Sequence, residues 1–180
     1  MNGRRRLLGS FTHGSMANAL PQAIGAQAAF PGRQVISFSG DGGFAMLMGD
    51  FLTLTQAGLS VKVVILNNGS LGFVEMEMKA GGFLDTGTNL ENPDFAAMGK
   101  AMGVFAVRVE DPADLHQALR DAFDHPGPAL VDVVTNRMEL IMPPTTTFKE
   151  AKGFGIYLAK AIMNGRGDEI VELAHTNIWR

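Results

Sequence analysis

Two polar clusters, each following an apolar stretch, hold the residues best suited to chemistry. Gly-Asp-Gly-Gly occupies residues 40–43, and Asn-Asn-Gly-Ser occupies residues 67–70. The first cluster places one carboxylate among residues without Cβ atoms, so a ligand can approach the main chain closely. The second cluster adds side-chain amide oxygens. A carboxylate, an amide and a nearby carbonyl form an incomplete oxygen shell, which Mg²⁺ typically completes with phosphate oxygens and water.

Each cluster alone has a plainer interpretation, because Asp-Gly and Asn-Gly are strong short signals of a hairpin turn. A hairpin would need a second strand after residue 43. Instead, the apolar residues that follow recur at the spacing of one face of an amphipathic helix: Phe44, Leu47, Met48, Phe51 and Leu52. A helix beginning there would offer free N–H groups and a positive dipole end to a phosphate. Together, the two clusters predict a Mg²⁺-diphosphate site.

The elements that must position these clusters alternate between helix and strand. The run over residues 61–66 is almost continuously apolar, as in a strand buried on both faces of a parallel sheet. The alternation predicts an α/β fold, an open and mostly parallel sheet flanked by helices, whose ligands bind beyond the carboxyl ends of the strands. Before residue 135 we expect helices over 18–30, 44–58 and 112–123, and strands over 34–39, 61–66 and 129–134.

The character of the chain changes after Thr135. Two prolines followed by three threonines at residues 143–147 predict a linker, and residues 149–163 and 168–177 predict two helices. We therefore divide the chain into a binding domain, 1–142, and a linker with a helical C-terminal tail, 143–180.

The last helix has two interpretations. Its apolar stripe ends near Trp179, and an aromatic residue at the end of an amphipathic helix suits a membrane interface. However, residues 161–180 carry two arginines, one aspartate and two glutamates, a net charge of −1, so their attraction to anionic lipid is weak. Docking of this helix on the protein is the alternative, and both interpretations stay open.

Composition excludes several classes of function. The 180 residues include no cysteine, which excludes disulfides, cysteine-ligated zinc, iron–sulfur clusters and thiol nucleophiles. The formal net charge of −3 gives no electrostatic footprint for nucleic acid. No run approaches the roughly 18 consecutive apolar residues of a membrane span, and the basic start lacks the apolar stretch of a signal peptide. We expect a cytoplasmic protein.

The clusters also resemble a known motif. Gly-Asp-Gly at residues 40–42, followed after 24 intervening residues by Asn67-Asn68, resembles the thiamine diphosphate motif of pyruvate oxidases, acetolactate synthases and 2-oxo acid decarboxylases. Within this family, the chain most resembles bacterial pyruvate oxidase, the flavin-containing, quinone-reducing pyruvate dehydrogenase. This resemblance runs over essentially the whole chain. The segments that carry it are residues 8–22, 42–44, 71–73, 77–82 and 165–169.

This resemblance implies decarboxylation of pyruvate to acetate and CO₂, with electrons passed through FAD to quinone. An acetolactate synthase-like or other 2-oxo acid decarboxylase domain is the alternative. A truncated, non-catalytic fragment that only binds Mg²⁺-diphosphate, or that partners with a separate chain, is a further one.

The resemblance also implies roles for particular residues. Asp41, the Asn68 side chain and the Ser70 carbonyl would ligate Mg²⁺, while Gly42, Gly43 and the amides after Asn68 would hold the diphosphate. The Gly14 carbonyl and Met16 amide would bond the aminopyrimidine ring, and the Met16 side chain would hold the cofactor bent. Phe73 would lie near the route of electrons to flavin, and no other residue receives a catalytic role. The implied cofactor-binding set is Gly14, Ser15, Met16, Asp41, Gly42, Gly43, Asn68, Gly69, Ser70, Leu71, Gly72 and Phe73.

Members of the resembled family have three domains, and this chain corresponds only to the last. The pyrimidine-binding domain, with the glutamate that activates the cofactor, and the FAD domain would lie outside it, as would the first strand and helix of the diphosphate domain. We therefore expect half a cofactor site, no turnover of pyruvate by this chain alone, and a homo-oligomer. The resemblance also favours lipid contact through the C-terminal helix at the inner face of the cell membrane.

Overall fold

The computed structural model describes residues 5–139 and 147–178 of the chain. These residues form two compact units. The first comprises the described residues up to Asn68 together with Glu91–Thr135, and the second comprises Gly69–Leu90 and the described residues from Asn136 onward.

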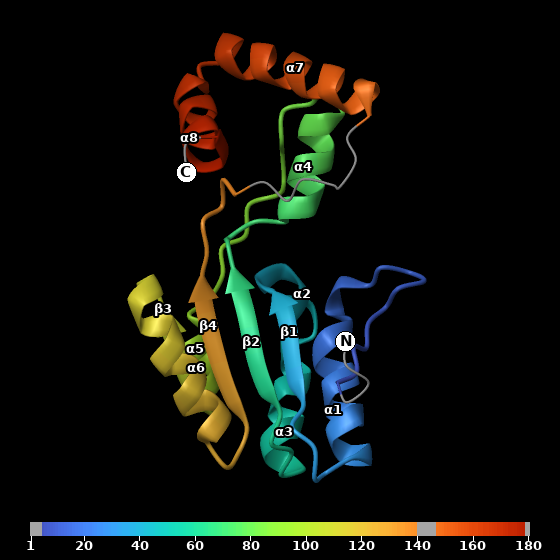
Figure 1. The fold of residues 1–180 in the computed structure, drawn as a ribbon, viewed down its shortest axis with the longest axis vertical. Coiled ribbons are helices and arrows are strands. Elements are labelled where there is room, and N and C mark those ends of the chain that lie inside the picture. Colours follow the sequence, from blue (N-terminus) through green and yellow to red (C-terminus); the bar gives the residue numbers. More distant parts are fainter. Residues whose placement is uncertain (1–4, 140–146, 179–180) are drawn as a thin grey trace. The chain divides into compact units, whose positions relative to one another are not determined.

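A four-stranded, all-parallel sheet forms the centre of the first unit (Figure 1). Its order is β1-β2-β4-β3, with β2 and β4 in the middle. This confirms the predicted open, parallel α/β sheet. The strands are β1 (Ile36–Gly40), β2 (Lys62–Asn67), β3 (Phe105–Val109) and β4 (Ala129–Val134).

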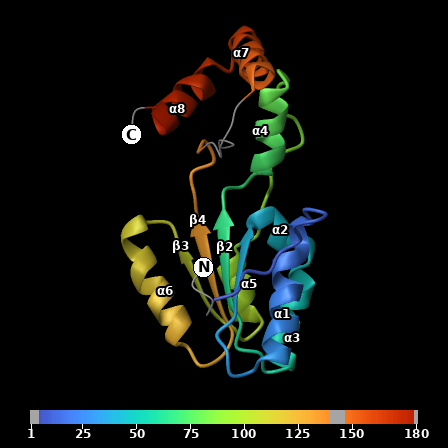
Figure 2. The same ribbon diagram turned by 45° about the vertical axis from the view of Figure 1, so that its right-hand side comes forward.

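Helices cover both faces of this sheet. Figure 2 shows α6 on one side of the strands and α1, α3 and α5 on the other. The helices of the first unit are η1 (Met16–Asn18), α1 (Ala19–Ala29), α2 (Asp41–Met46), η2 (Met48–Phe51), α3 (Leu52–Gln56), α5 (Phe95–Ala101), η3 (Pro112–Asp114) and α6 (Leu115–Asp124).

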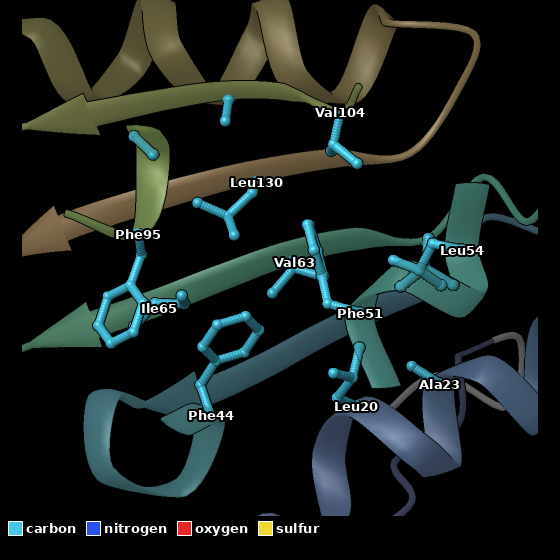
Figure 3. Close-up of a cluster of buried hydrophobic side chains, with 13 residues drawn as sticks. Leu20, Ala23, Phe44, Phe51, Leu54, Val63, Ile65, Phe95, Val104 and Leu130 are labelled. Carbon is cyan, nitrogen blue, oxygen red and sulfur yellow. The ribbon is translucent and has the colours of Figure 1, made fainter. Parts of the chain in front are cut away.

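Alternation along the strands divides the apolar side chains between two cores. Val63 and Ile65 of β2 pack into the core beneath α1, α2, α3 and α5, whereas Val64 packs with α6. Figure 3 shows the larger core, in which the Phe44 ring meets Phe51 and Phe95 edge-on, with centroids 5.7 Å and 5.3 Å apart. These ring contacts join α2 to η2 and α5, and α2 also packs against β1 and β2, whose loops begin beside it.

The predicted amphipathic helix over residues 44–58 is not continuous. The backbone leaves helical geometry at Leu47 (φ −129°, ψ 30°), and α2, η2 and α3 follow one another as short pieces. Phe44 and Phe51 are buried, but Leu47 and Met48 are exposed at 42% and 37%. The apolar spacing thus correctly identifies the two aromatic residues that reach the core, Phe44 and Phe51. The break in the helix at Leu47 leaves Leu47 and Met48 exposed.

Two further elements of this unit were not predicted, α5 and β3. Each is short, with seven and five residues. The predicted strands over 61–66 and 129–134 and the helix over 112–123 are confirmed within a few residues by β2, β4 and η3–α6.

The second unit is helical. It contains α4 (Gly72–Ala80), α7 (Phe148–Met163) and α8 (Gly167–Ile178), so the two predicted tail helices are confirmed and α4 is an addition. The α4 and α7 helices pack closely, because a Cβ built on Gly153 would lie 1.9 Å from the Ala80 carbonyl oxygen. A capping box of Thr147 and Glu150 begins α7.

Some predictions fall outside the described residues. The predicted linker prolines, the domain boundary at residues 142–143 and Trp179 are among them. Across residues 5–139 and 147–178, no helix combines the length and apolar character needed to cross a membrane.

Candidate functional site

The two polar clusters follow neighbouring strands. Asp41 comes directly after β1, Asn67 ends β2, and these parallel strands pair Gly40 with Leu66. Because parallel strands bring their carboxyl ends to one edge, Asp41 and Asn67 lie at the edge where open α/β sheets bind ligands. A hairpin at the first cluster is excluded, since α2 begins at Asp41 and the next strand is parallel to β1.

Asp41 is buried at the start of α2, with 2% of its surface exposed. Its Oδ1 accepts a hydrogen bond from the Gly42 N–H at 2.9 Å, and its Oδ2 accepts one from Asn92 Nδ2 at 2.7 Å. Each carboxylate oxygen offers two lone pairs, so a hydrogen-bonded carboxylate can also ligate a cation. The sequence therefore buries an oriented carboxylate at the edge of the sheet.

The bond from Asn92 belongs to a longer chain of polar side chains on the first unit. Asn92 Nδ2 also donates to Asn67 Oδ1 at 3.0 Å. Asn67 Nδ2 donates to Asp132 Oδ1 at 3.0 Å, and Arg108 Nη1 donates to Asp132 Oδ2 at 2.7 Å. These bonds link residues of β3, β4 and β2 to the carboxylate that follows β1.

The last pair in this series of hydrogen-bonded side chains, Asp132 and Arg108, explains how a charge is accommodated inside the sheet. Asp132 is fully buried in β4, and a buried carboxylate is tolerated only when it is paired and hydrogen-bonded. Arg108 provides that charge and also donates to Glu110 at 2.8 Å. The hydrogen bond to Glu110, and then that to Asp132, raises the pKa of Arg108, although partial burial acts in the opposite direction.

The segment of residues 14–16 meets residues 41–43. A Cβ built on Gly43 would lie 2.6 Å from the Met16 carbonyl oxygen, so only glycine permits this approach. Gly14 has a positive φ of 60°, and its N–H donates to the Ser10 carbonyl at 2.7 Å. The Ser15 carbonyl accepts from the Asn18 side chain, and Met16 is 45% exposed. The structure thus brings together two of the predicted segments.

The other predicted residues lie at the end of the first unit and in the second. Asn68 is the last residue of the first unit before the chain leaves it. In the second unit, the Ser70 hydroxyl donates to Glu75 Oε2 at 2.6 Å, and the Leu71 N–H donates to the Thr88 carbonyl at 2.8 Å. Gly69 has a positive φ of 66°, Gly72 begins α4 and Phe73 is 62% exposed. Their roles toward a cofactor or metal stay predictions.

Sequence reasoning missed three of these hydrogen-bonded side chains, Asn92, Arg108 and Asp132, and it placed Asn67 in the second cluster without giving it a role of its own. Asp132 carried a usable signal, because it is the one charged residue within the apolar run Ala129–Val134. Asn92 carried none, since its partner Asp41 is 51 positions away and nothing local marks the pairing.

A second acidic group lies within the second unit. Ligand atoms of Glu75, Asp85 and Glu169 lie within 4.8 Å of one another. Lys79 Nζ contacts Glu75 at 2.7 Å and Glu169 at 3.1 Å, and Arg166 contacts Asp85 at 2.6 Å. Because cations of the chain itself pair these carboxylates, the group is a salt-bridge network that joins α4, α8 and the segment after α4 that contains Asp85.

Comparison with known proteins decides the family. Residues 1–133 match the family described as the C-terminal TPP binding domain of thiamine pyrophosphate enzymes. The chain belongs to this family. Thiamine pyrophosphate is thiamine diphosphate, the cofactor whose motif the two clusters resemble.

This thiamine pyrophosphate-binding domain has similar counterparts in longer proteins. It is 35% identical over 173 residues, 96% of its length, to YdaP of Bacillus subtilis (strain 168), provisionally named as thiamine pyrophosphate-containing, and covers 30% of that protein. It is 38% identical over 147 residues, 79% of its length, to an acetolactate synthase of Arthrospira platensis, covering 25% of it. The mitochondrial acetolactate synthase catalytic subunit of Aspergillus candidus is 34% identical over 142 residues, 77% of this chain and 20% of that protein.

The residues of the binding domain suit a Mg²⁺-bound diphosphate. Asp41 supplies a buried carboxylate and Asn68 an amide side chain, and hard cations such as Mg²⁺ take oxygen ligands of this kind. By contrast, the carboxylates of the second unit already have Lys79, Arg137 and Arg166 as counterions. The donor chemistry therefore favours the edge of the sheet as the metal position.

Proposed function

We propose that this chain binds the diphosphate of thiamine diphosphate through Mg²⁺, with Asp41 as the anchoring ligand. The observation that carries the proposal is the buried Asp41 carboxylate, held by Gly42 and Asn92 at the carboxyl end of a parallel strand in a thiamine pyrophosphate-binding domain. Asn68 and the Ser70 carbonyl would complete the set of protein ligands.

The chain's own residues would bind and orient the cofactor. Asp41 and Asn68 would hold the metal, Gly42 and Gly43 would admit the diphosphate close to the main chain, and Gly14 and Met16 would face the aminopyrimidine. When bound, thiamine diphosphate supplies a carbon nucleophile that can accept a 2-oxo acid and stabilise the carbanion left by loss of CO₂. The chain spans between a fifth and a third of the relatives that it matches, so the activity of the whole protein is a further proposal.

For the whole protein we favour a flavin-linked pyruvate oxidase: pyruvate, water and quinone would give acetate, CO₂ and quinol. Support comes from the resemblance of the segments around residues 8–22 and 165–169. Acetolactate synthase is the second candidate, since two of the relatives carry that name at 34% and 38% identity. FAD, a homo-oligomer and lipid contact through the last helix belong to the first proposal.

Isothermal titration calorimetry of the 180-residue chain with thiamine diphosphate and Mg²⁺ tests the cofactor proposal. We expect weak, Mg²⁺-dependent binding that Asp41→Asn abolishes, because the amide keeps the shape of the side chain but removes the charge. Asp124→Asn on the exposed surface of α6 makes the same charge change elsewhere and should leave the isotherm unaltered. Equal binding by Asp41→Asn and the unmodified chain would refute the assignment.

The finer proposal is tested on the protein encoded by the complete reading frame. With pyruvate and a soluble quinone, an oxidase yields acetate and quinol, whereas the second candidate yields acetolactate without reducing quinone. A protein that binds Mg²⁺ and thiamine diphosphate but forms neither product would leave only the cofactor proposal standing.

A further inference from the structure

Asn92 joins the two polar clusters at the edge of the sheet. Its Nδ2 donates one hydrogen bond to Asp41 Oδ2 at 2.7 Å and another to Asn67 Oδ1 at 3.0 Å. A side-chain amide nitrogen carries two N–H donors, so both bonds can form at once. Asn92 itself is half-buried and comes from the segment before α5, far in sequence from either partner.

We propose that Asn92 is a positioning residue, which fixes the Asp41 carboxylate in the orientation that receives the Mg²⁺-diphosphate. The inference rests on the proposed function and extends it to a residue that would touch neither cofactor nor metal. Groups that hydrogen-bond to a metal ligand fix its orientation, and their loss typically lowers metal affinity by about 10- to 100-fold.

The core beneath the site fixes the segments that carry Asn92 and Asp41 next to each other. Phe95 and Phe44 are both fully buried and meet edge-on with centroids 5.3 Å apart (Figure 3). Asp41 lies three residues before Phe44, and Asn92 lies three residues before Phe95. Asp94 also caps α5 by accepting from the Ala97 N–H at 2.8 Å, which fixes the entry to that helix. One aromatic pair therefore anchors both partners of the hydrogen bond.

The orientation of the Asn92 amide is set from further away. The Asp132 carboxylate can only accept hydrogen bonds, so the Asn67 side chain must present its Nδ2 to Asp132 at 3.0 Å and its Oδ1 to Asn92. Asn92 must then turn its own Nδ2 toward Asn67 and Asp41. Arg108 pairs with Asp132 at 2.7 Å, on the carboxylate oxygen that Asn67 does not contact. The Asp132 carboxylate on β4 thus determines, through Asn67, that Asn92 presents its amide nitrogen and not its oxygen to Asp41.

This arrangement gives the carboxylate a fixed direction before any ligand arrives. The Asn92 and Gly42 donors hold one lone pair on each oxygen of Asp41, which prevents the carboxylate from rotating freely about its terminal torsion. Binding then loses less conformational entropy than it would with a free side chain.

Two substitutions test the proposal in the 180-residue chain, by calorimetric titration of Mg²⁺ at saturating thiamine diphosphate. Asn92→Ala removes the donor and should weaken Mg²⁺ affinity by about 10- to 100-fold. Asp132→Asn should also weaken it, by a smaller factor, because an amide at residue 132 allows Asn67, and with it Asn92, to adopt the opposite orientation. Asp132 has no direct role toward the ligand, so a purely local effect would not produce this second loss.

Gln27→Ala serves as the matched control. Gln27 is a buried amide of the same unit, and its Nε2 donates to the carbonyls of Phe30 and Arg33, away from the polar chain. It should lower the melting temperature of the ligand-free chain without changing the Mg²⁺ dissociation constant. If Asn92→Ala changes the dissociation constant no more than Gln27→Ala does, while Asp41→Asn still abolishes binding, the role of Asn92 is refuted and the proposed function stands. If the unmodified chain does not bind, the proposed function fails first.

Discussion

At the scale of single residues, the site depends on how one carboxylate is held. Asp41 is 2% exposed, yet its two oxygens accept from the Gly42 backbone and the Asn92 side chain. Burial of an unpaired carboxylate would carry a large desolvation penalty, so these donors permit it to stay at the end of β1. Gly43 contributes differently, since its missing side chain allows the Met16 carbonyl to approach α2.

The close approach at Gly43 leads to a prediction. In Gly43→Ala the new Cβ would lie 2.6 Å from the Met16 carbonyl oxygen, so η1 and α2 must separate. We expect a loss of about 1–3 kcal/mol in the free energy of unfolding, measured by urea denaturation, and weaker binding of thiamine diphosphate with Mg²⁺.

The matched control is Gly49→Ala, where nothing lies within 4 Å of the added Cβ. It should unfold at a urea concentration no lower than that of the unmodified chain. A Gly43→Ala variant as stable as Gly49→Ala would show that the 14–16 segment is free to move away from α2.

At the scale of elements, buried charges join α4 to α8, and the chain's only tyrosine joins α7 to α8. Tyr157 of α7 is fully buried, and its hydroxyl donates to Glu169 Oε1 of α8 at 2.9 Å. Burial first, and then the hydrogen bond to Glu169, raises the pKa of Tyr157 to about 12, although the nearby Lys79 charge acts in the opposite direction. Burial acts to raise the pKa of Glu169, but hydrogen bonds from Tyr157, Lys79 and Arg166 lower it.

The tyrosine provides a direct spectroscopic prediction. Its folded pKa lies above its ordinary value of 10.0, so its neutral form stabilises the packed helices below pH 10, and that contribution is lost as the pH rises toward 12. We expect the absorbance near 295 nm to titrate with a pKa of about 12 in the folded chain and about 10 in urea. Titration near 10 in the folded chain would mean that Tyr157 is not buried against α8.

The elements differ in how much of them the sequence could reveal. β2 and β4 were predicted because both are apolar runs with turn residues after them, and α7 and α8 because glycine and asparagine separate two periodic stretches. β3 was missed although its single charged residue, Arg108, is no different in kind from Lys62 of β2 and Asp132 of β4, strands that were predicted. Arg108 forms an ion pair with Asp132 of β4. This partner can be recognised only when β3 and β4 are known to be neighbouring strands.

At the scale of the whole molecule, the chain passes twice from the sheet to the helical unit. It leaves the first unit after Asn68, returns at Glu91 and leaves again after Thr135. The segment 69–90 therefore belongs with the tail because α4 packs against α7, a long-range contact that no local pattern announces. The same logic explains the site: its carboxylate was visible in the sequence, but the amide that orients it was not.

Both units contain a group of carboxylate oxygens, although those of the second unit are already paired with Lys79, Arg137 and Arg166. The first has Asp41 at the end of β1, and the second has Glu75, Asp85 and Glu169. Mn²⁺ can replace Mg²⁺ and broadens the NMR signals of nuclei close to it, so it reports the position of the cation directly.

The most direct measurement is the ¹H–¹⁵N spectrum of the 180-residue chain with thiamine diphosphate, before and after substoichiometric Mn²⁺. We predict selective broadening of the backbone amides of residues 41–43 and of the Asn92 side-chain amide, with the amides of α6 unaffected. Broadening centred on Glu75 and Glu169, or none beyond that of free Mn²⁺, would contradict the assignment of Asp41 as the metal anchor.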